Sequence, residues 1–191
     1  MLFEILSHTP TWVWVLLAFL LYRGAAAMRP RDVAPGRVLI VPLVFFVWGA
    51  TGLVSATEGL AVKIILFIAA LAVGLAIGRV LASLSDPPRL SRATGMMTMP
   101  GSPAPLILIV LAFVTKYCGS VALALATDVG VRAELSSAMA ATGGLFAGLM
   151  WGRTLGQFQR ALRAAGQPVT VATLAGLVAG PAGANAPERL S

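Results

Sequence analysis

The basic residues of this chain are unevenly divided among the segments that separate five long apolar stretches. If the chain crosses a bilayer at each stretch, eleven of the 14 Lys and Arg residues fall on one side. One falls on the other side, and two lie within the stretches. Because basic residues resist translocation, arginine-rich loops stay on the cytoplasmic face of a membrane. The pattern therefore predicts a multi-pass membrane protein with its N-terminus outside and its C-terminus inside.

The five stretches predict an all-α fold, a helical bundle of five transmembrane helices. They cover residues 10–28, 38–54, 60–84, 105–127 and 135–158, and each reaches the roughly 17 residues needed to cross a bilayer core. The chain is 58% hydrophobic and only 11% charged, against about a quarter charged in soluble domains. Abundant Ala, Gly and Arg with only two Lys is typical of a GC-rich bacterial genome, so we expect the bacterial cytoplasmic (inner) membrane.

The predicted domains are a transmembrane domain over residues 1–163 and a cytoplasmic tail over residues 164–191. Residues 168–180 are uncharged but only modestly apolar. They favour an interfacial or re-entrant helix over a sixth span, with disorder after Pro181. In the loop before the fourth span, Thr94 and Gly95 suit the tight turn of a small hairpin.

Lys116 is the sharpest functional candidate, because it lies near the middle of the fourth predicted span. It is 11 residues from either end, and at 1.5 Å per residue this places it about 16 Å deep. A charge there costs about 2.5–3.5 kcal/mol on insertion scales. Tyr117 and Ser120 add polarity nearby. A neutral amine, hydrogen bonds to helix carbonyls, or a wet cavity that admits an anion would each resolve the cost, and a purely structural lysine is the alternative.

Glycine recurs every four residues in the fifth span, at Gly144, Gly148, Gly152 and Gly156. Such a stripe lets another backbone approach closely, which is a common mode of helix association in lipid. The partner is either a helix of the same chain, with Gly74 and Gly78 as the obvious counterpart, or a second copy in a homodimer.

The arginines of the basic loops predict contacts with anionic lipid headgroups at the inner face. They are Arg29, Arg31, Arg37, Arg89 and Arg92. Since these residues follow helix ends, they do not indicate a nucleic-acid partner. The chain has one Cys and one His, which argues against a metal site, a disulfide or a haem cofactor within one chain.

Two strings carry a resemblance to a known family. MRPRDVAPGRVLIVPLVF follows the first span, and TGMMTMPGSPAPLILIVLAFVTKY leads into the fourth. Both resemble the corresponding loops in a family of small uncharacterised bacterial inner-membrane proteins, a domain of unknown function. The resemblance implies an inner-membrane protein and no particular activity.

Two functions follow from these features. The first is a pathway for a small solute or anion, with Lys116 as its charged element. The second is a non-catalytic membrane scaffold or assembly factor, with the basic loops and the glycine stripe as contact surfaces. The sequence has no catalytic motif of the common hydrolase, nucleotide-binding or metalloprotease types, so we do not predict an enzyme.

Overall fold

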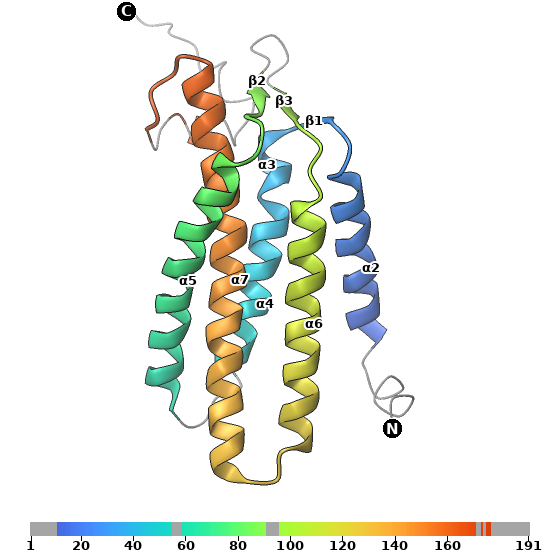
Figure 1. The fold of residues 1–191 in the computed structure, drawn as a ribbon, viewed down its shortest axis with the longest axis vertical. Helices are drawn as coiled ribbons and strands as arrows, with labels where there is room; N and C mark the ends of the chain where they lie inside the picture. Colours follow the sequence, from blue (N-terminus) through green and yellow to red (C-terminus); the bar gives the residue numbers. More distant parts are fainter. Residues whose placement is uncertain (1–10, 55–58, 91–95, 171–172, 174, 177–191) are drawn as a thin grey trace, which may run out of the picture.

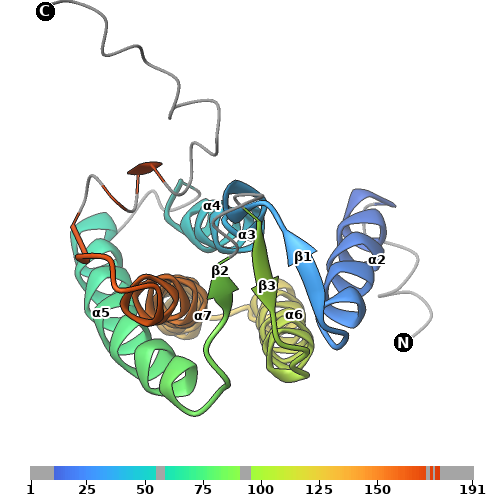
Figure 2. The same ribbon diagram turned by 90° about the horizontal axis from the view of Figure 1, so that it is seen from above.

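Helices make up most of the protein in a computed structural model, which describes residues 11–54, 59–90, 96–170, 173 and 175–176. Consecutive long helices run in alternate directions along one axis (Figure 1). Seen along this axis, α5 and α2 lie at opposite edges, with α4, α6 and α7 between them (Figure 2). The helices are α2 (Thr11–Ala26), α3 (Pro35–Val38), α4 (Ile40–Val54), α5 (Leu60–Ser83), α6 (Ala104–Leu125) and α7 (Val129–Ala164).

Two of these helices, α5 and α6, are long and apolar enough to cross a membrane, judged by length and composition. Only 17% of the apolar window of each helix is buried, so most of its apolar side chains face outward. A core helix of a soluble protein would bury that surface. The exposed apolar side chains of α5 include Val62, Ile65, Ile68, Val73 and Val80.

The other helices differ from the predicted spans in length. α2 and α4 have 16 and 15 described residues, whereas α7 has 36. The Asp128 carboxylate accepts a hydrogen bond from the Val131 N–H at 2.9 Å. This N-cap lets α7 begin at Val129, inside the segment predicted to connect the fourth and fifth spans. The helix ends before Gly166, whose φ of +67° suits a glycine at a helix terminus.

The tail prediction falls largely on residues outside the described part of the chain, namely 171–172, 174 and 177–191. The described portion shows α7 continuing to Ala164, one residue beyond the predicted domain boundary. The interfacial helix and the disordered end therefore stay predictions.

A three-stranded antiparallel sheet of eight residues departs from a purely all-α fold. Its order is β1-β3-β2, with β1 (Arg31–Val33), β2 (Arg89–Leu90) and β3 (Met97–Met99). β2 and β3 flank the predicted hairpin turn, which itself lies outside the described residues. β1 was not predicted, because three residues give no sustained alternation and the partner strand lies far along the chain. The sheet crosses one end of the molecule, between α2 and α7 (Figure 2).

The glycine stripe of α7 packs against α5 of the same chain. A Cβ built on Gly148 would collide with the Leu71 carbonyl, and one on Gly74 would collide with the Leu145 carbonyl. The two helix backbones can lie this close only because neither has a side chain at the contact. α5 thus occupies the stripe. The predicted homodimer stays a prediction, and it would have to use another face.

Arg160 of α7 closes the end of α5 that lies near the sheet. Its guanidinium donates to the carbonyls of Ala82 and Ser85. Ala82 lies in the last turn of α5 and Ser85 two residues beyond the helix, where the negative end of the helix dipole favours a cation. The contact fixes the register of α5 against α7 at the end where the sheet lies.

Candidate functional site

A cavity of about 180 Å³ lies at the sheet end of the bundle, bounded by α2, α3, α4, α6, α7 and two of the strands. Four arginines line it, together with three neutral polar residues and an apolar wall. Within the described residues, no carboxylate contributes to the lining. The polar lining residues are Arg23, Arg31, Arg37, Ser102, Arg153, Thr154 and Gln157.

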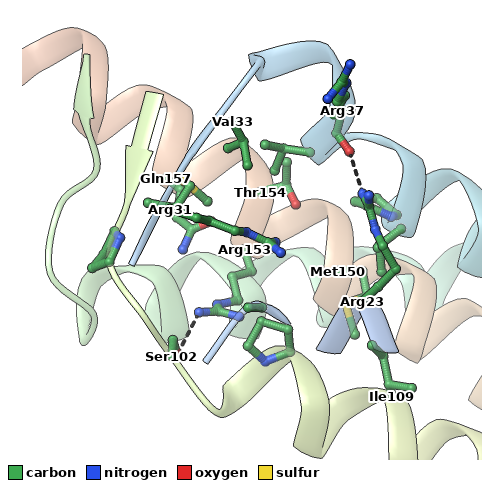
Figure 3. Close-up of a pocket in the computed structure, with 17 residues that line it drawn as sticks. Arg23, Arg31, Val33, Arg37, Ser102, Ile109, Met150, Arg153, Thr154 and Gln157 are labelled. Carbon is green, nitrogen blue, oxygen red and sulfur yellow. Dashed lines mark hydrogen bonds between the residues drawn. The ribbon is translucent and has the colours of Figure 1, made fainter. Parts of the chain in front are cut away.

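Four different elements supply the arginines that line the cavity, although the Arg37 side chain is exposed and points away from it (Figure 3). Arg23 comes from the last turn of α2, Arg31 from β1, Arg37 from α3 and Arg153 from α7. Figure 3 shows Arg31 and Arg153 in the middle of the cavity, with Arg23 across from them. None of the four is paired with a carboxylate of the described chain. The cavity therefore concentrates positive charge that the protein itself does not neutralise.

The alternation of β1 explains why the nearest acid does not neutralise the cavity. Successive strand residues point to opposite faces. Arg31 and Val33 line the cavity, whereas Asp32 is exposed. The Asp32 carboxylate instead accepts a hydrogen bond of 2.5 Å from the Thr98 hydroxyl, across the sheet. The strand therefore directs Arg31 toward the cavity and Asp32 away from it.

Arg153 is the most buried of the four arginines, with 5% of its surface exposed. Its Nη2 donates to Ser102 Oγ at 3.0 Å. Its Nε is buried without a partner among the described residues, as are the Nε atoms of Arg23 and Arg31. Buried donors without acceptors are rare and cost free energy. An oxyanion in the cavity would supply the missing acceptors.

Ser102 connects three parts of the site. Its N–H donates to the Ala27 carbonyl of the α2 end at 2.9 Å. Its hydroxyl oxygen accepts from the Ala104 N–H at 3.3 Å and from Arg153. Since both acceptor positions are used, the hydroxyl proton is left to donate. Ser102 therefore orients Arg153, anchors the end of α2 and adds a donor at the cavity.

The cavity electrostatics favour a bound anion. Burial lowers the pKa of Arg31, and the neighbouring charge of Arg23 lowers it further. Both causes mean that the charged guanidinium is disfavoured while the cavity holds no counter-ion. Guanidinium groups present forked donors that match carboxylate and phosphate oxygens. The arrangement can bind a small oxyanion.

The predicted pathway residues lie elsewhere. Lys116 is 8% exposed; its Nζ donates to the Trp48 carbonyl at 3.4 Å and lies 6.0 Å from the centre of the Trp48 ring. Tyr117 stacks on Phe113, with ring centroids 5.9 Å apart, and Ser120 is exposed. None of these predicted residues lines the cavity. Of the three predicted ways to offset the cost of a buried charge at Lys116, the structure shows a hydrogen bond to a helix carbonyl.

The arginines predicted to contact headgroups separate into three groups. Arg29 and Arg89 are exposed, Arg31 and Arg37 line the cavity, and Arg92 lies outside the described residues. Nothing in the sequence connected Arg23 and Arg153 with them. One signal was present, because Arg153 lies five residues inside the predicted end of the fifth span and an arginine there needs a partner.

Comparison with known proteins identifies the family of this chain, and no activity is known for that family. Residues 1–169 match the model of a family of unknown function, DUF6622. The chain belongs to this family. The resemblance to a family of unknown function, drawn from the two loop strings, is confirmed. Every residue that lines the cavity lies within the part matched to DUF6622.

A curated relative of this DUF6622 chain adds no function. The chain is 39% identical over 41 residues to the uncharacterized protein PM0739 of Pasteurella multocida (strain Pm70). The match covers 22% of this chain and 32% of the relative, so the chain spans about a third of that protein's length. No solved structure matches.

Proposed function

We propose that this protein is a multi-pass protein of the bacterial cytoplasmic membrane that binds a small oxyanion in its arginine cavity. One observation carries the proposal: the side chains of Arg23, Arg31 and Arg153 lie at a cavity that no described carboxylate lines (Figure 3). Each of the three buries an Nε atom that lacks a partner within the described chain. Phosphate and carboxylate groups carry the acceptor oxygens that such donors require.

The size of the cavity limits the ligand. Its volume is about 180 Å³. Sites that enclose drug-sized molecules occupy about 300–1,000 Å³. One phosphate or carboxylate group with a few attached atoms fits this space, whereas a nucleotide would not be enclosed.

The membrane topology rests on α5 and α6 together with the distribution of arginine. We place α2, α4 and α7 in the bilayer as well, because each alternates in direction with its neighbours along the same axis (Figure 1). Most arginines lie near the sheet, whereas Arg132 belongs to the opposite end, in the first turns of α7. Under the rule that basic segments stay inside, the sheet end is cytoplasmic and the N-terminus is outside.

A scaffold or assembly factor is the second candidate function. It is favoured by Lys116, whose amine bonds α6 to the Trp48 carbonyl of α4 and lines no described cavity. That position suits a structural contact better than a solute pathway. An anion in the arginine cavity would then stabilise the assembly-competent fold rather than be transported.

Thermal unfolding of the purified protein in a non-ionic detergent tests oxyanion binding. Phosphate, sulfate and acetate are compared with chloride at equal ionic strength, so that general screening is held constant. We expect at least one oxyanion to raise the melting temperature, because a ligand that binds only the folded state stabilises it.

Arg153→Met and Arg31→Gln each remove a cavity donor and should abolish that rise. Arg163→Gln is the matched control, because Arg163 lies on the same helix as Arg153 but is exposed and outside the cavity. Arg31→Gln keeps the test valid if Arg153→Met does not fold. The proposal fails if no oxyanion differs from chloride, or if both cavity variants keep the full rise.

A further inference from the structure

We infer that the oxyanion is the phosphate group of a membrane lipid, held in the arginine cavity while its acyl chains stay in the bilayer. This inference rests on the proposed function and names its ligand. It is drawn from the two-sided chemistry of the cavity and its depth along the bundle.

The cavity wall has a cationic part and an apolar part. Apolar side chains come from α3, α4, α6 and α7 and face the same space as the arginines. A free phosphate ion is strongly hydrated and gains nothing from such a wall, whereas a lipid phosphate ester brings glycerol and acyl carbons with it. The apolar lining residues include Val38, Val41, Pro42, Ile109 and Met150.

The cavity lies where the phosphate layer of the inner leaflet would lie in the proposed topology. Arg23 is in the last turn of α2, and its guanidinium carbon lies 6.0 Å from the centre of the Phe19 ring. The adjacent Tyr22 is 73% exposed. Tyrosine and arginine at the end of an apolar helix are typical of the boundary between hydrocarbon and headgroups. A lipid phosphate at this depth needs little displacement to enter.

In the proposed topology we place the approach of the lipid on the α2 side of the cavity. Arg23 of α2 and Ala27 just after this helix line the cavity together with Val41 and Pro42 of α4, and Pro42 is fully buried. α2 packs chiefly against α6, whereas α4 packs chiefly against α7. At this end α2 is joined to α3 by the bond from Arg23 to the Arg37 carbonyl at 3.0 Å, and further along the bundle Leu20 and Phe45 share one buried cluster. A lipid headgroup that enters here would take over the Arg23 guanidinium from the Arg37 carbonyl.

The experiment uses three probes that separate the phosphate from the acyl chains. Inorganic phosphate is the headgroup alone, dihexanoylglycerol is the tails alone, and dihexanoyl phosphatidic acid has both. Each is titrated against the full-length protein in a non-ionic detergent, with the melting temperature as readout. Lipid retained by the protein after mild purification is identified by native mass spectrometry.

We expect the phosphatidic acid to raise the melting temperature at concentrations about 10- to 100-fold lower than inorganic phosphate, since burying a few methylene groups adds this much affinity. Dihexanoylglycerol should have little effect. Arg153→Met should remove the response to phosphatidic acid, whereas Arg163→Gln should keep it. Native mass spectra should show retained phospholipid for the wild type and the Arg163→Gln variant.

Two other outcomes overturn the inference in distinguishable ways. If inorganic phosphate is as effective as phosphatidic acid, the cavity takes a soluble oxyanion, so oxyanion binding stands and the lipid is wrong. If neither phosphate nor phosphatidic acid acts, oxyanion binding fails as well. Equal responses to dihexanoylglycerol and phosphatidic acid would mean that the tails bind elsewhere without any use of the arginines.

Discussion

Lys116 contributes its charge to a contact between helices. The Trp48 carbonyl that accepts from its amine also accepts from the Thr51 hydroxyl at 2.7 Å. Removing the amine would therefore leave that carbonyl with a partner. The lysine, by contrast, is buried among apolar helices, and within the described chain it has no carboxylate as a counter-ion.

From this contact we predict that Lys116→Met is neutral or stabilising. The substitution keeps an unbranched apolar stem and removes a buried charge, a change that is often neutral or favourable when the remaining groups stay satisfied. A gain of about 1 kcal/mol would raise the melting temperature by about 2–4 °C in a chain of this size. The measurement is thermal unfolding in detergent with and without phosphate. A variant that folds but loses its phosphate response would instead assign Lys116 to the anion site.

At the residue scale, the sequence indicated which side chains are unusual but not what they contact. Lys116 is conspicuous because it lies deep in an apolar segment, yet its acceptor is 68 residues away on another helix. Arg23 and Arg31 each read as an ordinary basic residue near a helix end, and only the depth of Arg153, five residues inside its predicted span, was unusual. Their convergence depends on how four elements meet, and no local pattern encodes that.

At the scale of elements, α5 and α7 pack backbone against backbone, and they can do so because glycines lie at their contact. A methyl group on Gly148 would meet the backbone of α5, including the Gly74 Cα at 3.0 Å. A methyl group on Gly119 of α6 would meet only the flexible Met139 side chain, at 3.1 Å and beyond. These two positions form a matched pair.

We predict that Gly148→Ala destabilises the protein whereas Gly119→Ala does not. Both changes gain up to about 1 kcal/mol of helix propensity. At Gly148 that gain is outweighed by overpacking against backbone, which costs about 1–3 kcal/mol or more. The measurement is the midpoint of thermal or denaturant unfolding in detergent. Equal stability of the two variants would show that α5 and α7 do not approach as closely as described.

The positions of the long helices followed from apolar runs, because such runs are local in sequence. The prediction of 60–84 for one span differs from α5 by a single residue at its end. The start of α7 was missed because Asp128 reads as a loop acid and only its geometry makes it a cap. β1 was missed because its pairing with β3 spans 66 residues between Asp32 and Thr98.

At the scale of the whole molecule, the proposed topology places the arginine cavity in the cytoplasmic leaflet. We predict that reporter fusions after Arg31, Arg89 and Arg163 report a cytoplasmic location, and that a fusion after Asp128 reports an external one. The reason is the bias of arginine toward the sheet end. Paired alkaline phosphatase and fluorescent protein reporters measure it. An external signal at Arg89 together with an internal one at Asp128 would invert the topology.

The few contacts that join α2 to the other helices suggest the order in which parts of the molecule unfold locally. This helix is joined to the rest mainly by its packing on α6, by the bond from Ser102 to Ala27 and by the bond from Arg23 to the Arg37 carbonyl at 3.0 Å. Because α7 packs along both α4 and α5, those three helices should open together and late. Hydrogen exchange in detergent should therefore give α2 amides a lower protection factor than α5 or α7 amides. A ligand that bridges Arg23 and Arg153 should slow exchange in α2 more than elsewhere, since it would join the most detachable helix to the most protected one.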